Sequence, residues 1–121
     1  MRETSWADPA RSPHPTLTAD AVDVWRADLS VDGAQERALL SPAEEQRAAR
    51  FARQELGRRW ALARGILRAL LARYTGLDPR ALEFREGPHG KPALAGTQPS
   101  LRFNLSHSGG VALYVLSLIH I

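Results

Sequence analysis

The sequence predicts an α+β domain in which helices pack on an antiparallel sheet. Two segments with strict apolar alternation, residues 21–29 and 101–105, flank a long helical region. The segment 106–110 that follows the second of them is short and glycine-rich, as in hairpin connections. Strands separated in this way from helices are typical of α+β rather than α/β architecture. A chain of 121 residues forms one domain and can bury a core without disulfides.

The N-terminal part divides into two stretches. Residues 1–18 hold three prolines among polar residues and have too little apolar surface to offset the entropy of ordering. We therefore expect this segment to be disordered. Residues 21–29 place Trp25, Ala27 and Leu29 on one side of a strand.

The helical region begins with a capping box, because Ser41 is followed by Pro42 and, three residues on, by Glu44. Gly76 is a suitable C-terminal cap. The region is too long for one typical helix, so we expect a break near residues 55–58, at Gly57. Its second part carries one apolar stripe that predicts core positions: Trp60, Ala63, Leu67, Leu70, Leu71 and Tyr74.

Short elements follow the helices. Asp78 and Pro79 predict one helical turn. After it we expect a strand at 82–85, a loop at 87–92, a loop at 97–100, a strand at 101–105, a tight turn at 106–110 and a strand at 111–116.

Composition excludes several classes of protein. The chain has no cysteine, so a disulfide scaffold, a thiolate metal site and a cysteine nucleophile are ruled out. Its four histidines are scattered without metal-ligand spacing. No apolar run approaches the length of a membrane span, and residues 1–12 lack the apolar core of a secretory signal. We expect a cytoplasmic protein without a membrane partner.

Positive charge is concentrated in residues 44–73, which hold eight arginines and three glutamates. Such a segment favours an anionic partner, although it is equally typical of a solvated helix face. Lys91, the only lysine, lies between Gly90 and Pro92 on a stiffened loop. Residues 104–110 (NLSHSGG) bring two hydroxyls, an imidazole and two glycines to the end of a strand, which suits phosphate. Taken singly, Gly-Lys-Pro is a common turn and a lone histidine is usually structural.

In combination these features are specific. The chain resembles the first half of the larger, Sfp-type 4′-phosphopantetheinyl transferases. It has, in the order found in that family, the strand VWRADL, the helix start LSP, the tripeptide Gly-Lys-Pro and the string FNLSHS. The resemblance covers residues 21–115. It implies transfer of the phosphopantetheine arm of coenzyme A onto a serine of an acyl or peptidyl carrier protein, as in holo-[acyl-carrier-protein] synthase.

The resemblance also implies a fold and a site. The family is a pseudo-dimer of two α+β halves, and residues 19–115 match the N-terminal half. Coenzyme A and Mg²⁺ bind between the halves. Carried over by position, the coenzyme A contacts are Arg47, Arg64, Gly90, Lys91, Pro92, Ser106 and His107, with Arg59 a weaker candidate. Glu44 stands where some members have a basic residue.

The family's metal-binding acids lie in its second half, and this sequence has no Asp or Glu after Glu86. We therefore expect no catalytic or metal-ligating residue here, and no transfer by this chain alone. Residues 116–121 contain two of the chain's three isoleucines. One hypothesis is that they are a non-native tail on a truncated sequence; the other is an ordinary strand end.

Two alternatives remain at this point. One is a small basic module that binds nucleic acid or an acidic protein through its arginines. The expected burial of Trp60 and Tyr74 argues against nucleic acid, because stacking on bases needs exposed aromatic rings. The other is a half-length subunit that dimerises.

Overall fold

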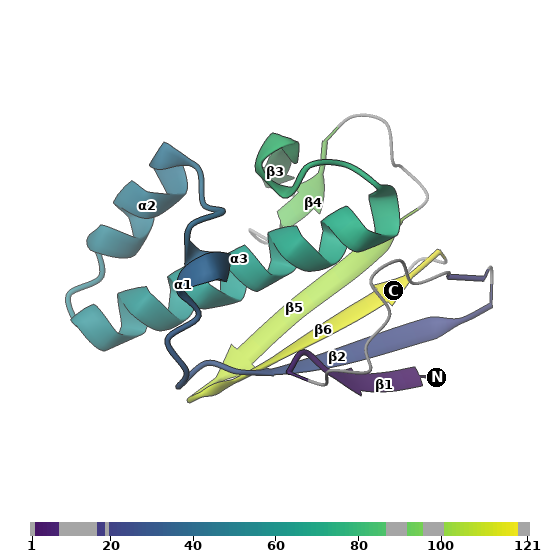
Figure 1. The fold of residues 1–121 in the computed structure, drawn as a ribbon, viewed down its shortest axis with the longest axis horizontal. Helices are drawn as coiled ribbons and strands as arrows, with labels where there is room; N and C mark the ends of the chain where they lie inside the picture. The colour runs from purple at the N-terminus through teal and green to yellow at the C-terminus, as the bar shows by residue number, and fades with distance from the viewer. Residues whose placement is uncertain (1, 8–16, 19, 87–91, 96–100, 119–121) are drawn as a thin grey trace.

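A four-stranded sheet carries all the helices on one of its faces (Figure 1). The computed structural model describes residues 2–7, 17–18, 20–86, 92–95 and 101–118. The strand order is β1-β2-β6-β5, with β1 parallel to β2 and the other pairs antiparallel. The α+β prediction is confirmed. The strands of this sheet are β1 (Arg2–Ser5), β2 (Val22–Asp28), β5 (Arg102–Ser108) and β6 (Val111–Ser117).

The helical layer is followed by a small second sheet. Its two antiparallel strands lie beside the long helix (Figure 1), and Phe84 of this sheet contacts Phe103 of β5 with ring centroids 6.2 Å apart. No helix within the described ranges is both long enough and apolar enough to cross a membrane. The elements are α1 (Ala34–Arg37), α2 (Pro42–Ala49), α3 (Gln54–Thr75), the 3₁₀ turn η1 (Pro79–Ala81), β3 (Phe84–Glu86) and β4 (Pro92–Leu94).

The core lies between α3 and the main sheet. Trp25, Ala27 and Leu29 are buried, as their alternation predicts. From the neighbouring strand β6, Tyr114 is fully buried and donates a hydrogen bond of 2.8 Å to the Ala63 carbonyl on α3. That bond satisfies the one polar atom that this large ring brings into the interior.

Local signals place the helix ends as predicted. The Ser41 hydroxyl accepts a 3.2 Å bond from the Glu44 N–H, and the Glu44 carboxylate accepts a 3.0 Å bond from the Ser41 N–H. Gly76 ends α3 at φ 75°, and its N–H donates to the Ala72 carbonyl at 2.8 Å. Glycine adopts this left-handed conformation without strain, because it has no Cβ.

The helix break lies elsewhere than expected. The chain leaves α2 at Arg50 and enters α3 at Gln54, so Gly57 is inside α3 rather than at the break. Gly57 is needed for a close approach, because a Cβ there would collide with the Ala48 carbonyl of α2. The glycine is therefore needed so that α2 and α3 can pack closely, and it does not end a helix.

The prediction that residues 1–18 are disordered is wrong for residues 2–5, which form β1. Asp23 is buried, and its carboxylate accepts bonds of 2.7 and 2.6 Å from the Arg2 guanidinium and of 2.6 Å from the Tyr74 hydroxyl. Leu17 packs against the core. Residues 8–16 lie outside the described residues. The composition of residues 1–18 does not reveal this strand, because the ion pair that holds it joins Arg2 to a residue far away in the sequence.

The tight turn expected at 106–110 is shorter than predicted. Ser106 and His107 continue β5, and only Gly109 and Gly110 make the turn, with Gly109 at φ 59°. The strand expected at 82–85 appears as β3, and the one expected at 111–116 as β6. Leu116 and Ser117 are buried in β6. Residues 119–121 lie outside the described residues, so the non-native tail stays a hypothesis.

Gly65 lets helices α1 and α3 approach closely, since a Cβ there would collide with the Glu36 carbonyl. We predict that Gly65→Ala lowers the free energy of unfolding by about 1–3 kcal/mol, because two backbone segments must separate. Urea denaturation measures this. Gly110→Ala is the control, as a Cβ there meets open space. Equal stabilities of the two variants would contradict the packing described.

Candidate functional site

An arginine-lined cleft of about 530 Å³ lies between the start of α2, the middle of α3 and the β3–β4 hairpin. Arginines outnumber acids in its wall. The charged residues that line it are Arg47, Arg64, Arg68, Arg80, Arg85, Glu44, Glu83 and Glu86. The chemistry of the cleft depends on which of these charges are already neutralised by each other.

Glu44 is the buried acid at the centre of this group, with its side chain 11% exposed. Its Oε2 accepts a 3.1 Å bond from Arg64 Nη1. Its Oε1 accepts a 2.8 Å bond from Arg68 Nε in addition to the Ser41 N–H. One carboxylate therefore neutralises parts of two guanidinium groups and caps its own helix.

Arg68 is a structural group. Its side chain is 5% exposed, and its Nη1 donates 2.9 Å bonds to the carbonyls of Pro79 and Leu82. Together with the bond to Glu44, these contacts hold η1 and the chain leading to β3 against α3. Little of this guanidinium remains for a ligand.

Arg64 differs from Arg68 although it lies one turn away on the same helix. Its guanidinium carbon lies 5.0 Å from the ring centroid of Trp60, whereas both arginines lie 5.1 Å from that of Phe84. Its Nε is buried, and no hydrogen-bond partner for it is found among the residues that the structure describes. A buried N–H without a partner costs about 1–3 kcal/mol, so this donor would gain from an anionic ligand in the cleft.

Arg47 extends from α2 into the same cleft and lies over the Trp60 ring at 4.8 Å. Trp60 thus carries two guanidinium groups and contacts Phe51 at 6.3 Å. It is half-buried and outside the core, so its prediction as a core residue is wrong. The argument against nucleic acid therefore does not hold for Trp60. It does hold for Tyr74, whose hydroxyl is bonded to Asp23 and Trp25.

Burial and charge act in opposite directions on these groups. Burial raises the pKa of Glu44, but the bonds from Arg68 and Ser41 and the charge of Arg64 outweigh it, so that the pKa lies below the ordinary value of 4.5. Burial lowers the pKa of Arg64, and Glu44 opposes that change. Arginine nevertheless stays protonated at neutral pH, so the cleft keeps its positive charge.

The structure brings together three of the residues predicted from sequence. Arg47, Arg64 and Pro92, the first residue of β4, line one cleft. Gly90 and Lys91 lie outside the described residues, directly before Pro92.

Ser106 and His107 are exposed on β5 and do not line that cleft. His107 shares its sheet face with Phe103 and Leu105, which pack against the core. Ser106 points to the opposite face.

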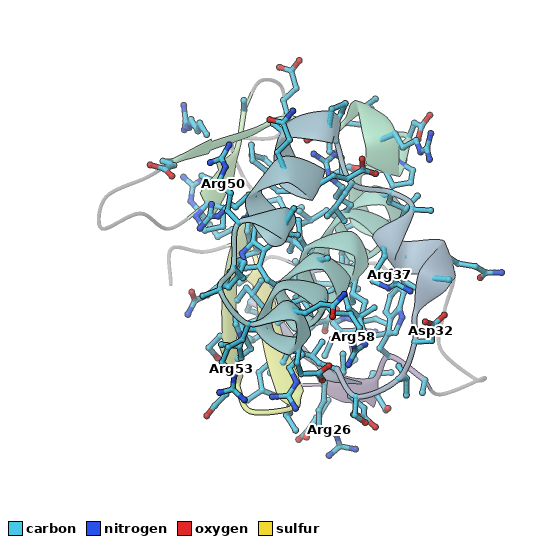
Figure 2. The ribbon with its side chains drawn as sticks, turned by 90° about the vertical axis from the view of Figure 1, so that its left-hand side faces the viewer. Arg26, Asp32, Arg37, Arg50, Arg53 and Arg58 are labelled. Carbon is cyan, nitrogen blue, oxygen red and sulfur yellow. The ribbon has the colours of Figure 1, made fainter. Side chains whose placement is uncertain are left out.

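Other arginines of the basic segment lie outside the cleft. Arg58 donates to Glu55 at 2.9 Å, and Arg59, the weaker candidate, donates to the same carboxylate at 3.1 Å. Figure 2 places Arg50 and Arg53 on the left of the view and Arg58 toward the right, and neither Arg50 nor Arg53 lines the cleft. The charge of residues 44–73 is therefore divided between a cleft and a solvated surface.

The sequence pattern did not indicate that Glu44 organises the cleft, and it assigned no role there to Arg68 or Phe84. The only signal was the four-residue spacing of Arg64 and Arg68, which puts them on one helix face. The described residues contain no cluster of three His, Asp or Glu that could hold a metal ion. Glu44, the buried acid of the cleft, is committed to arginines, so these residues do not fit a Mg²⁺ site.

Most of the chain is similar to one family of known proteins. Residues 25–117 match the family model described as 4′-phosphopantetheinyl transferase, N-terminal. The chain belongs to the 4′-phosphopantetheinyl transferase family. The match includes the arginines of the cleft, the Gly-Lys-Pro loop and β5, and it starts after β1.

Three relatives in this transferase family are similar to the chain. The 4′-phosphopantetheinyl transferase HetI of Nostoc sp. is 40% identical over 118 residues, which are 93% of this chain and 49% of HetI. The putative 4′-phosphopantetheinyl transferase slr0495 of Synechocystis sp. is 42% identical over 82 residues, 67% of this chain and 33% of that protein. A 4′-phosphopantetheinyl transferase of Bacillus subtilis is 32% identical over 72 residues, 60% and 32%. The chain thus spans half or less of the length of these relatives.

The lowered pKa of Glu44 predicts acid sensitivity. A carboxylate whose pKa is lower in the folded state contributes stability above its unfolded pKa, and this contribution is lost as the pH falls through the folded value. We predict that the free energy of unfolding falls between about pH 5 and pH 3, and that Glu44→Gln flattens this fall. Urea titrations across this range measure it. Glu45→Gln, on the exposed side of α2, is the control and should keep the slope. Equal slopes for both variants would refute the assignment.

Proposed function

We propose that this chain forms the coenzyme A-binding half of a 4′-phosphopantetheinyl transferase that modifies a serine of an acyl or peptidyl carrier protein, in the manner of holo-[acyl-carrier-protein] synthase. The observation that carries the proposal is an arginine-lined cleft in which the buried Nε of Arg64 has no hydrogen-bond partner among the described residues. Membership of the family supports the reaction class. We place the reaction in the cytoplasm.

Coenzyme A suits this cleft because it carries a diphosphate and a 3′-phosphate. Guanidinium groups match phosphate oxygens with paired donors, and charge-assisted bonds are stronger than neutral ones. Arg47 and Arg64 are proposed to bind phosphate while Trp60 and Phe84 support their planar faces. Gly90, Lys91 and Pro92 would form the loop beside the adenine and the 3′-phosphate.

Ser106 and His107 are proposed as further phosphate contacts from β5. Both are exposed and have donors available to a ligand that extends beyond the cleft. A molecule as long as coenzyme A can contact the cleft with one phosphate group and the strand with another. Because the two side chains lie on opposite faces of β5, which ends the strand order β1-β2-β6-β5, the proposal places the ligand over the outer edge of this strand, where both can reach it.

In the proposed reaction the serine oxygen bonds to the pantetheine-side phosphorus and the diphosphate P–O bond breaks. The serine proton is released and adenosine 3′,5′-bisphosphate leaves. The residues of this chain would bind the phosphates, orient them and neutralise their charge. We propose that Mg²⁺ and its acidic ligands are supplied from outside the described residues, and that this chain alone binds coenzyme A without transferring its arm.

Arg64→Gln tests the site directly. It removes the charge and the fork of donors while keeping a chain of similar length, so we predict that coenzyme A binding weakens by about 1.5–3 kcal/mol. Isothermal titration calorimetry with coenzyme A measures it. Arg50→Gln, an exposed arginine outside the cleft, is the matched control and should bind as the wild type does. Equal binding by all three proteins would refute the proposed function.

The loop and the strand give a second prediction. Lys91→Ala and His107→Ala should each weaken coenzyme A binding by about 1–3 kcal/mol, through the loss of a charge-assisted bond. Calorimetry is again the measurement, with His14→Ala, a histidine between two prolines, as the control. Unchanged binding in both variants would remove these residues from the site.

A further inference from the structure

We propose that Glu44 is a positioning residue, which sets the direction of the Arg64 guanidinium for an anionic ligand. The inference rests on the proposed function, since it assigns Arg64 to phosphate. Glu44 would not touch the ligand. It would act through the 3.1 Å bond between its Oε2 and Arg64 Nη1.

The two oxygens of Glu44 have different partners. Oε1 accepts from Arg68 Nε and from the Ser41 N–H, so this oxygen holds the fold of α2 against α3. Oε2 accepts from Arg64 alone among the bonds found in the described residues. On this one side chain, Oε1 therefore makes the contacts that hold the fold, and Oε2 makes the contact that would orient Arg64.

Three contacts fix the plane of the Arg64 guanidinium: the Glu44 oxygen and the rings of Trp60 and Phe84. The two rings keep the plane of the guanidinium from tilting. They do not fix its rotation within that plane, because the quadrupole of a ring attracts the whole cation and not one particular N–H group. Only the carboxylate selects which N–H groups remain free. With Nη1 held by Glu44, the buried Nε has no partner among the described residues, and the remaining donors keep a fixed direction.

A negative charge is needed at this position. Arg47, Arg64 and Arg68 are close enough that the charges of Arg47 and Arg68 both lower the pKa of Arg64. A neutral glutamine could still accept from Arg68 and Ser41 through its carbonyl. Its NH₂ group would then face Arg64, so that two donors meet and the guanidinium has to turn away.

Glu44→Gln is therefore the test, measured with coenzyme A as the probe at a temperature well below melting. We expect coenzyme A affinity to fall about tenfold or more, the size expected for a lost charge-assisted contact. The double variant Glu44→Gln/Arg64→Gln should bind no more weakly than Arg64→Gln alone, because Glu44 acts only through Arg64. Additive losses would overturn the inference.

A stability control separates positioning from unfolding. Tyr74→Phe removes the hydroxyl that bonds to Asp23 and Trp25, at the far end of α3 from Trp60. It should lower the melting temperature while leaving coenzyme A affinity unchanged. An affinity loss in Tyr74→Phe equal to that in Glu44→Gln would overturn the positioning role, as would affinity within about twofold of wild type in Glu44→Gln.

Trp60 provides a readout that needs no ligand. Its emission, obtained as the difference between each protein and the same protein with Trp60→Phe, reports the cations over its ring. Glu44→Gln should shift this emission, and Tyr74→Phe should not. If wild-type protein fails to bind coenzyme A, the proposed function fails. The positioning of Arg64 is then decided by this spectrum alone, and an unshifted emission in Glu44→Gln overturns it.

Discussion

The ion-pair cluster around Glu44 joins most of the helical layer. The carboxylate caps α2 at Ser41 and bonds to Arg64 and Arg68 of α3. Arg68 in turn holds the backbone of η1 and the approach to β3 through the carbonyls of Pro79 and Leu82. Breaking a buried pair leaves an uncompensated charge, which costs more than the pair itself contributes. Arg64 and Arg68 therefore depend on one acid to neutralise the charge that they bring into a buried site.

Sequence analysis succeeded where the signal is local. The capping box at Ser41, the αL glycine at Gly76 and the alternation of β2 all involve residues within a few positions of each other, and all three are confirmed. It failed where the cause is a distant contact. The strand β1 depends on the pairing of Arg2 with Asp23, although its polar composition is typical of disorder. Gly57 depends on a carbonyl of the preceding helix, although a glycine within a helical stretch is typical of a break.

The candidate site shows the same division. A family motif placed Arg47, Arg64 and Pro92 in one site, and the structure finds them in one cleft. Spacing could not separate Arg64 from Arg68, because both lie on one helix face and differ only in what covers them. The carbonyls that occupy Arg68 belong to a turn that begins at Pro79, beyond the reach of any helical periodicity. Trp60 was assigned to the core by its period, although arginines rather than leucines surround its ring.

The strand order has a consequence for synthesis. β6 comes after β5 in the chain but lies in the interior of the sheet, between β5 and β2, with Val22 paired to Ser117. As the chain leaves the ribosome, α2 and α3 can form from local signals while β2 still lacks its antiparallel neighbour. Until residues 111–117 have emerged, β2 and β5 lack the strand that joins them, so the sheet over the apolar face of α3 stays incomplete. The main sheet can therefore close only after β6 has been synthesised.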